Sequence, residues 1–307
     1  MIILAAPLQG YTEAPFRHFH REIYGPVCDG YFSPFVRVEH GEIRRRDLRD
    51  IESPLCANHK LVPQVIMRDI TEFRMLINGV TACGYNRVDL NLGCPFALQL
   101  RQGRGAAMLV NVAELKRIAE GMTEYPNVTF SVKMRLGLDR ETDWRDVVPV
   151  LNSMPLSHVT LHPRTARDEY RGPIRHDVFA ALLTELDHPV IYNGDVSTPD
   201  GIDAIMTRYP LVSGVMVGRG LMARPSLINE WRERSEWDAT RRLQHIMSLH
   251  DGIYRHYCST LCGEAQIISK IKPFWEYLVP MLDKKVAKAI KKATTLTGYT
   301  AAIAPLR

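Results

Sequence analysis

The sequence predicts a parallel (β/α)8 barrel followed by a small all-helical region. Short segments rich in branched apolar residues alternate with longer amphipathic segments through the first three quarters of the 307 residues. Such alternation is typical of a parallel sheet covered by helices, and the strand-like segments number eight, which closes a TIM barrel. After residue 235 no further strand-like segment is found. We therefore predict two domains, a barrel over residues 1–235 and a helical domain over residues 236–307.

Each predicted strand is followed by turn residues or by the start of a helix. The strands cover Ile2–Leu8, Gly30–Phe35, Leu61–Met67, Asn86–Gly93, Thr129–Arg135, His158–Arg164, Pro189–Asn193 and Gly214–Gly218. The first helix opens at Thr12–Pro15, with Thr12 as a candidate N-cap, and Pro225 opens a short last one. The others have apolar residues at helical spacing and cover Thr71–Ala82, Ala113–Thr123, Trp144–Asn152, His176–Leu186 and Pro199–Thr207. In the tail, helices are predicted over Arg241–Tyr257, Glu264–Leu278 and Lys284–Thr295.

Composition is that of a soluble globular protein. Hydrophobic residues make up 46% and charged residues 24%, and no apolar run approaches the roughly 18 residues that a membrane span requires. Residues 1–7 look like a strand rather than a signal peptide. Six cysteines are too few for a disulfide scaffold in a chain of this length, which favours the cytoplasm. The net charge of +5 permits a polyanionic partner without requiring one. We expect a monomer.

No metal site is expected. His250, His256, Cys258 and Cys262 lie close together in the tail, but their spacing matches no zinc pattern, and packing within a helix explains them better.

The segment from Val88 to Pro95 is the most informative of the chain. Its apolar and polar residues alternate as in a half-buried strand, and Gly93 and Pro95 end that strand abruptly. Cys94 is thereby left at a strand end, three residues after Asn91. A lone cysteine is usually a buried, inert thiol. Its surroundings favour a functional role instead.

Polar faces occur near the ends of several neighbouring strands. Alternate residues of a barrel strand face the axis, and those at its C-terminal end reach the active-site mouth. The residues predicted to converge there are Gln64, Asn91, Cys94, Lys133, Arg135, His162 and Arg164. One interpretation is a core network of mutually satisfied polar groups; the other, which we favour, is a ligand site, because buried polar groups need partners.

Strands seven and eight end in Asn193-Gly194-Asp195 and Gly218-Arg219-Gly220. In TIM barrels the loops after these two strands commonly bind a phosphate through backbone N–H groups. A single glycine is an ordinary turn residue, but this pair, with the charge of Arg219, indicates a phosphorylated cofactor.

The sequence resembles the tRNA-dihydrouridine synthase family along its whole length. The matching segments are Ala5–Leu8, Tyr11–Glu13, Gln64–Val65, Asp89–Pro95, Val132–Gly137, His162–Thr165, Tyr170–Gly172, Asn193–Asp195 and Gly218–Gly220. Two departures stand out: Leu8 replaces a usual methionine, and Pro163 replaces a usual glycine, which affects the backbone of that loop.

The resemblance implies FMN in the barrel mouth and reduction of a specific uridine in tRNA, with NADPH as the electron source. The implied FMN contacts are Pro7, Leu8, Gln9, Gln64, Lys133, His162, Asn193, Gly194, Asp195, Gly218 and Arg219. Cys94 is implied as the catalytic acid. Asn91, Lys133, Arg135, His162 and Arg164 are implied around the target base.

The residue types suit this chemistry. Reduction of the uracil 5,6 double bond needs a hydride at carbon 6, which reduced flavin can supply, and a proton at carbon 5. A cysteine with an ordinary pKa is a thiol at neutral pH and can supply that proton. Lys133 nearby favours the thiolate, so we place it against the flavin pyrimidine edge instead. The target nucleotide has to be flipped into the barrel.

Lysines gather on the predicted tail helices. Lys284, Lys288 and Lys291 share one broad helical face, and Lys270 and Lys272 lie in the preceding helix. Such a face is either merely solvated or binds phosphates; behind a tRNA-modifying barrel, phosphate binding is the better prediction.

Two other functions remain open. The chain could be another FMN barrel acting on a small molecule, such as a dihydroorotate dehydrogenase, or a non-catalytic RNA-binding protein or chaperone. The lysine-rich tail disfavours the first, and the combination of Cys94 with Lys133 disfavours the second.

Overall fold

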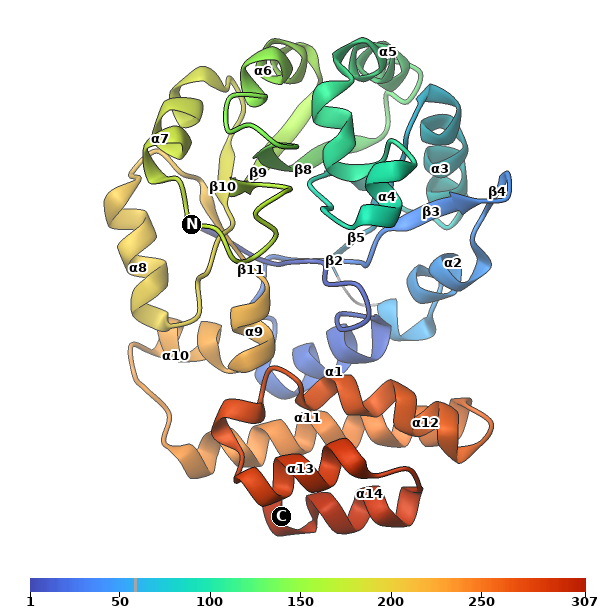
Figure 1. Cartoon of the computed structure of the whole chain (residues 1–307), viewed down its shortest axis with the longest axis vertical. Helices are drawn as coiled ribbons and strands as arrows, with labels where there is room; N and C mark the ends of the chain where they lie inside the picture. Colours follow the sequence, from blue (N-terminus) through green and yellow to red (C-terminus); the bar gives the residue numbers. More distant parts are fainter. Residues whose placement is uncertain (58–59) are drawn as a thin grey trace.

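The computed structural model describes residues 1–57 and 60–307 and confirms the predicted barrel (Figure 1). One sheet contains the strands in the order β4-β3-β6-β7-β8-β9-β10-β11-β1-β2-β5. Their bounds are Ile2–Ala5 (β1), Gly30–Phe32 (β2), Val36–Glu39 (β3), Glu42–Ile43 (β4), Leu61–Val62 (β5), Gln64–Ile66 (β6), Arg87–Leu92 (β7), Thr129–Gly137 (β8), Leu156–Thr165 (β9), Val190–Tyr192 (β10) and Gly214–Val217 (β11). All neighbours pair in parallel except the β3–β4 hairpin.

Two of the eight predicted strands are interrupted by proline, and this corrects the strand bounds. The second, predicted over Gly30–Phe35, ends at Phe32 as β2, and the chain rejoins the sheet after Pro34 as β3, which lies beyond the predicted end. The third divides into β5 and β6 around Pro63. Proline has no N–H to donate to a ladder, so regular pairing stops there. Because β2 pairs with β5 while β3 pairs with β6, these two broken strands lie side by side and close the barrel. The short strand β4 was not predicted.

Pro163, the residue that departs from the family pattern, does not end its strand. β9 runs through it to Thr165, and the Pro163 carbonyl accepts a hydrogen bond from the N–H of Arg175.

Helices surround the sheet (Figure 1). They are Ala14–Tyr24 (α1), Arg45–Ile51 (α2), Ile70–Ala82 (α3), Ala97–Arg101 (α4), Val112–Met122 (α5), Trp144–Ser153 (α6), His176–Glu185 (α7), Pro199–Arg208 (α8), Arg219–Ala223 (α9) and Leu227–Glu233 (α10). The short helices α2, α4 and α9 were not predicted. Side chains of Asp69, Asn111 and Thr198 cap α3, α5 and α8.

Thr12 does not cap α1, contrary to the prediction. Glu13 occupies the N-cap position, without a side-chain hydrogen bond. The Thr12 hydroxyl instead accepts a hydrogen bond from the N–H of Leu8 and donates one to its carbonyl. Thr12 therefore fixes the loop that follows the first barrel strand.

The tail is helical, and in the described part of the chain no strand follows β11. Its helices are Ala239–Thr260 (α11), Glu264–Ile271 (α12), Lys284–Lys292 (α13) and Leu296–Ile303 (α14). Pro273 ends α12 in a 3-10 turn, and α13 ends at Lys292, so the predicted helices over 264–278 and 284–295 are too long, and α14 was missed.

The tail packs against the barrel through α1, which lies next to α11 (Figure 1). Phe16 and Tyr24 of α1 join Trp237, Trp275 and Tyr299 of the tail in one buried apolar cluster, separate from the main barrel core. A shared cluster of this kind holds the tail in a defined position beside the barrel mouth.

Candidate active site

A cavity of about 720 Å³ opens at the C-terminal end of the barrel strands. Every residue predicted to contact a cofactor lines it, namely Pro7, Leu8, Gln9, Gln64, Lys133, His162, Asn193, Gly194, Asp195, Gly218 and Arg219. Cys94, Asn91 and Arg135 line it as well. Loops after β1, β7, β10 and β11 contribute most of its walls, because the C-terminal ends of parallel strands meet at one mouth.

The backbone of Cys94 is held from both sides. The amide oxygen of Asn91 accepts hydrogen bonds from the N–H groups of Gly93 at 3.1 Å and Cys94 at 2.8 Å. On the other side, Ala106 donates its N–H to the Cys94 carbonyl. Gly105 has a φ of +63°, and a Cβ there would lie 2.8 Å from that carbonyl oxygen, so only glycine fits.

Cys94 is a thiol at rest. Burial raises the pKa of the Cys94 thiol, and this outweighs a backbone hydrogen bond at Phe96 and the charges of Arg135 and Lys133, which lower it. Burial disfavours the charged form of any acid. Burial thus favours the protonated thiol of Cys94, although the charge of Lys133 nearby favours the thiolate.

Lys133 points its charge into the same cavity without a protein partner. Across residues 1–57 and 60–307, its ammonium group forms no hydrogen bond or ion pair. Burial, and next Arg135, lower the pKa of Lys133 to about 8, against the opposing effect of Asp89 and Cys94. A half-buried, unpaired ammonium group is costly, so the group is suited to an anionic or hydrogen-bond-accepting ligand.

His162 is buried and neutral. Burial, together with nearby Arg135 and Lys133, keeps the pKa of His162 well below its usual value. Arg164 donates to His162 Nε2 at 3.3 Å, and since arginine can only donate, Nδ1 carries the ring proton. His162 can therefore donate one hydrogen bond from Nδ1.

Arg164 does not line the cavity, although it was predicted around the target base. Besides His162 it binds the Gly172 carbonyl and one oxygen of Asp195. The second Asp195 oxygen pairs with Arg219, whose guanidinium lies over the Tyr170 ring. Arg164 is thus a support behind the cavity wall.

Arg135 also has structural partners while lining the cavity. Its guanidinium group donates to the carbonyls of Gly93, Thr165 and Glu169, and its carbon lies 5.3 Å from the Tyr170 ring centroid. These bonds join the ends of β8 and β9 to the Cys94 loop.

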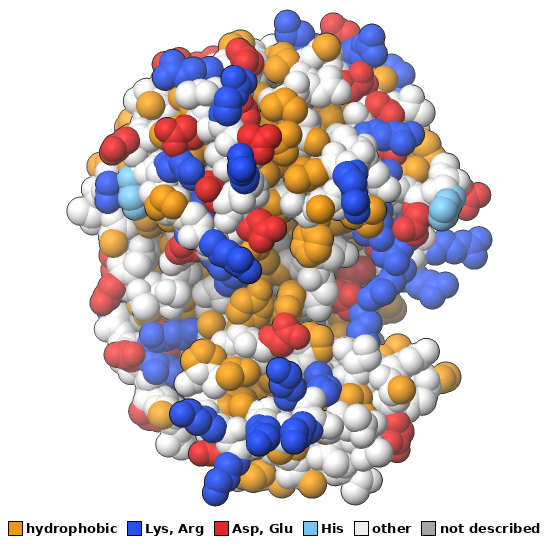
Figure 2. Space-filling model, in the orientation of Figure 1, with side chains coloured by type: hydrophobic (Ala, Val, Ile, Leu, Met, Phe, Trp, Pro, Cys, Tyr) orange, Lys and Arg blue, Asp and Glu red, His pale blue; other side chains and the backbone are white. Residues whose placement is uncertain are grey.

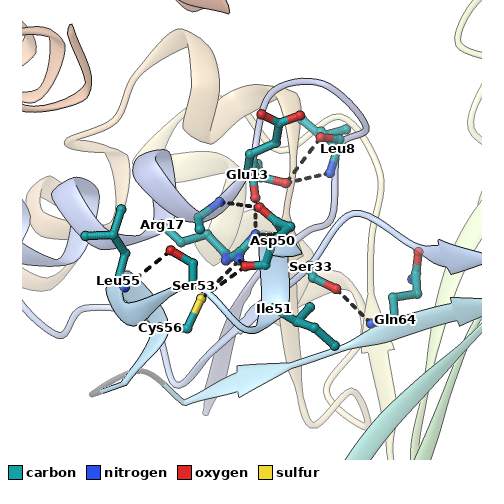
Figure 3. A network of polar contacts seen from close by, with 12 residues as sticks. Leu8, Glu13, Arg17, Ser33, Asp50, Ile51, Ser53, Leu55, Cys56 and Gln64 are labelled. Atoms are coloured by element: carbon teal, nitrogen blue, oxygen red, sulfur yellow. Dashed lines mark hydrogen bonds and ion pairs between the residues drawn. The ribbon is translucent and has the colours of Figure 1, made fainter. Parts of the chain in front are cut away.

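A polar network behind the cavity fixes the loop after β1 (Figure 3). Buried Arg17 donates to the Thr12 carbonyl and forms an ion pair with Asp50, which also accepts the N–H of Ala14. A further contact joins Arg17 to the Cys56 sulfur. Because Thr12 in turn binds Leu8, the network sets where Leu8 and Gln9 stand at the cavity wall.

Five aromatic cavity residues were not predicted as site residues: Tyr11, Phe35, Phe96, Tyr170 and Tyr277. Phe96 follows Cys94 by two residues and is 70% exposed, which the adjacent cysteine motif could have signalled. Tyr277 belongs to the tail and packs edge-on against Tyr11 at 5.1 Å. No pattern in the sequence indicates that this part of the tail lies at the barrel mouth.

The predicted tail lysines fall into two groups. Lys270 pairs with Glu13, and Lys272 donates to the carbonyls of Lys291 and Ala293, where it caps the end of α13. By contrast, Lys284, Lys288 and Lys291 are exposed. Figure 2 shows Lys and Arg side chains gathered over the tail and at the right edge of the hollow between barrel and tail.

No group of three metal-ligating side chains occurs among the residues that the structure places. Within that same part of the chain, none of the helices is long and apolar enough to cross a membrane. All six cysteines are unpaired.

A closed parallel barrel with a thiol, an unpaired lysine and a neutral histidine at its mouth is typical of TIM-barrel enzymes, whose active sites lie at this end of the barrel. Comparison with known proteins makes the class specific. The family model for dihydrouridine synthase (Dus) matches residues 3–279. The chain belongs to the dihydrouridine synthase family and is thus an oxidoreductase.

Individual relatives agree with this assignment. A probable tRNA-dihydrouridine synthase of Staphylococcus epidermidis is 25% identical over 90% of this chain and 84% of its own. A tRNA-dihydrouridine(47) synthase [NAD(P)(+)] of Coprinopsis cinerea is 30% identical over 95% of this chain, which spans 46% of that longer protein. Among solved structures, morphinone reductase shares the fold, with a TM-score of 0.53 and 8% identity over 78% of this chain and 87% of that one.

Proposed function

We propose that this protein is a tRNA-dihydrouridine synthase that binds FMN and reduces the 5,6 double bond of one specific uridine in tRNA, with NADPH as reductant. The observation that carries the proposal is the placement of the Cys94 thiol and the unpaired Lys133 ammonium on one cavity at the barrel mouth. The first is a proton donor and the second a partner for an electron-rich ligand.

The residues present fit FMN. A cavity of about 720 Å³ has room for the cofactor beside a base. Lys133 would hold the pyrimidine edge, Gln64 and His162 would add hydrogen bonds, and Pro7, Leu8 and Gln9 would contact the ring system. Asn193–Asp195 and Gly218–Arg219 would hold the ribityl chain and phosphate. When bound and reduced, FMN supplies the hydride for carbon 6 of uracil.

Cys94 would supply the proton. The Sγ–H bond breaks, a carbon–hydrogen bond forms at carbon 5, and the thiolate that remains takes up a proton from solvent. Burial keeps the proton on sulfur before the reaction, while Arg135 and Lys133 stabilise the thiolate afterwards, since both charges lower the pKa of Cys94. Asn91 and Arg135 would line the pocket for the base.

The tail would bind the tRNA. We propose residues 236–307 as a recognition domain in which Lys284, Lys288 and Lys291 contact phosphates. Lys270 and Lys272 would act mainly by holding the tail in place, because both have protein partners. Exposed Phe96 stands at the mouth, where a base next to the flipped nucleotide could stack. We expect a monomer that works in the cytoplasm.

Two measurements test the proposal. The purified protein should be yellow, release FMN on denaturation, and be reoxidised by intact unmodified tRNA after reduction with NADPH. Dihydrouridine mapped in tRNA from cells with and without the protein should differ at one position. Reoxidation by a small molecule such as orotate, and not by tRNA, would favour a dihydroorotate dehydrogenase-like enzyme, and a colourless protein would favour RNA binding without catalysis.

A further inference from the structure

A chain of hydrogen bonds joins a buried carboxylate to the backbone of Cys94. Asp89 is completely buried on β7, two residues before the cavity residue Asn91. Its Oδ2 accepts from Gln64 Nε2 at 2.7 Å, and Gln64 Oε1 accepts from Asn91 Nδ2 at 2.7 Å. Asn91 Oδ1 then accepts the N–H groups of Gly93 and Cys94. The pairing of β6 with β7 brings Gln64 opposite Asp89.

The direction of this chain is fixed at both ends. At one end, two backbone N–H groups require an acceptor, so the oxygen of Asn91 must face Cys94 and its NH2 group must face Gln64. At the other end, burial raises the pKa of Asp89 to about 6, so its carboxyl group is ionised at neutral pH and can only accept, and the NH2 group of Gln64 must face it. Both ends therefore select the same orientation of the two amides.

We propose that Asp89 is a positioning residue for the reaction: through Gln64 and Asn91 it fixes the backbone from which the Cys94 thiol reaches the cavity. The inference rests on the proposed function, because it assumes that Cys94 delivers a proton to the bound base. Asp89 itself does not line the cavity. Its effect on catalysis is therefore indirect and depends on the orientation of the two amides.

A variant at Ser131 tests whether any buried hydrogen bond to Asp89 matters, or only the one that leads to Cys94. Its hydroxyl donates to the other oxygen of Asp89 at 2.6 Å, a bond as short as the one to Gln64, but it leads away from Cys94. Loss of that bond leaves the chain from Asp89 to Cys94 complete. Ser131→Ala is therefore a matched control.

Replacement of Asp89 by asparagine removes the negative charge of the carboxylate but keeps the orientation of the Gln64 and Asn91 amides. Its side-chain oxygen can accept from Gln64 while its NH2 group donates to Ser131. The reverse orientation would turn both amides and set the NH2 group of Asn91 against two backbone N–H groups. Asp89→Asn therefore keeps the chain and removes the charge, whereas Asp89→Leu and the smaller Asp89→Val break the chain.

The experiment is rapid mixing of pre-reduced holoenzyme with saturating unmodified tRNA, with flavin absorbance as the signal. Asp89→Leu and Asp89→Val should be reoxidised on the order of 10²-fold more slowly, the effect of misplacing a reacting group by about 1 Å. Flavin reduction by NADPH and the Kd for tRNA should stay within about threefold of wild type, as expected when binding is intact. Asp89→Asn and Ser131→Ala should react within about threefold of wild type.

The outcomes are distinct. Wild-type rates in a folded Asp89→Leu or Asp89→Val variant overturn the inference and leave the proposed function intact. An Asp89→Asn rate as low as that of Asp89→Leu also overturns it, because charge and not amide orientation would then matter. Wild-type enzyme that tRNA does not reoxidise overturns the proposed function, and the inference with it.

Discussion

Arg219 and Asp195 form an ion pair at the cavity mouth, with 2.5 Å between Nη2 and Oδ1. The pair joins the loops that follow β10 and β11, the two loops proposed to hold a phosphate. Arg164 binds the other oxygen of Asp195 from behind, and this arrangement lowers the pKa of the carboxyl group. Arg219 is thus held in place before a ligand arrives, and little conformational freedom remains to be lost on binding.

Replacement of Arg219 by alanine should lower the FMN occupancy of the purified protein. A charge-assisted phosphate contact is typically worth about 1.5–3 kcal/mol, which corresponds to roughly 10- to 150-fold in Kd. Titration of the apoprotein with FMN, followed by flavin fluorescence, measures the change. Arg208→Ala, an exposed arginine on α8 away from the cavity, is the control. Equal FMN affinity in the two variants would remove Arg219 from the phosphate site.

Replacement of Lys284, Lys288 and Lys291 together should weaken tRNA binding and flatten its dependence on salt. Each lost phosphate contact reduces the slope of log K against log salt by roughly one. Binding is measured at several salt concentrations. The control removes the same charge from exposed residues on barrel helices, Lys116, Arg145 and Arg208. Reduction of FMN by NADPH should be unchanged in both triple variants, and an unaltered slope would mean that the tail lysines are merely solvated.

The barrel could be predicted from the sequence because its signals are local. Alternating apolar residues indicate β7, β8 and β9, and the polar residues at the strand ends indicate the cavity. The interruptions of strand pairing at Pro34 and Pro63 could not be predicted, because a proline in an apolar run does not indicate whether pairing resumes beyond it.

Contacts between distant parts of the chain could not be predicted. The hydrogen bond from Tyr11 to Glu276 spans 265 positions, and no local pattern announces it. The same holds for the partners of Lys270 and Lys272, which looked like free cations on a helix and are bound within the protein. Arg164 likewise follows His162 by two residues on β9, which predicts that both face the cavity. Its guanidinium group instead binds Asp195 and the Gly172 carbonyl, and Arg164 does not line the cavity.

Replacement of Phe96 by alanine should weaken productive tRNA binding. Stacking of a base on an aromatic ring is worth about 1–3 kcal/mol, or roughly 5- to 150-fold in Kd. Phe96→Trp should restore the affinity and Phe96→Leu should not, because leucine offers apolar surface without a π face. Leu211→Ala, at a residue that is also 70% exposed but does not line the cavity, is the control. Full restoration by leucine would exclude stacking.

Retention of FMN should fall as pH rises through about 8. The pKa of Lys133 is lowered to about 8, so its ammonium charge is present below that pH and is lost above it. Loss of the charge removes the partner for the flavin pyrimidine edge, and the effect should be larger for reduced FMN, which carries negative charge. Reduction potentials measured between pH 6 and 10 test this. Lys133→Met should retain FMN weakly at every pH and show no change in retention near pH 8. A change that persists in that variant would belong to another titrating group.

Replacement of Cys94 by alanine separates the two half-reactions. If Cys94 is the general acid, Cys94→Ala should bind FMN, accept electrons from NADPH and bind tRNA as wild type does. Only reoxidation of the reduced flavin by tRNA should slow, by about 10²–10⁴-fold for loss of a positioned proton donor.

The control variants come from the other cysteines. Cys258 and Cys262 are exposed on the tail, and their alanine variants should react at the wild-type rate. Cys94→Ser should be only slightly faster than Cys94→Ala, because a hydroxyl is a far weaker acid than a thiol. The measurement mixes pre-reduced enzyme with excess unmodified tRNA and follows flavin absorbance. A wild-type rate in Cys94→Ala would refute the acid assignment, and the Asp89 chain would then position a residue that catalysis does not use.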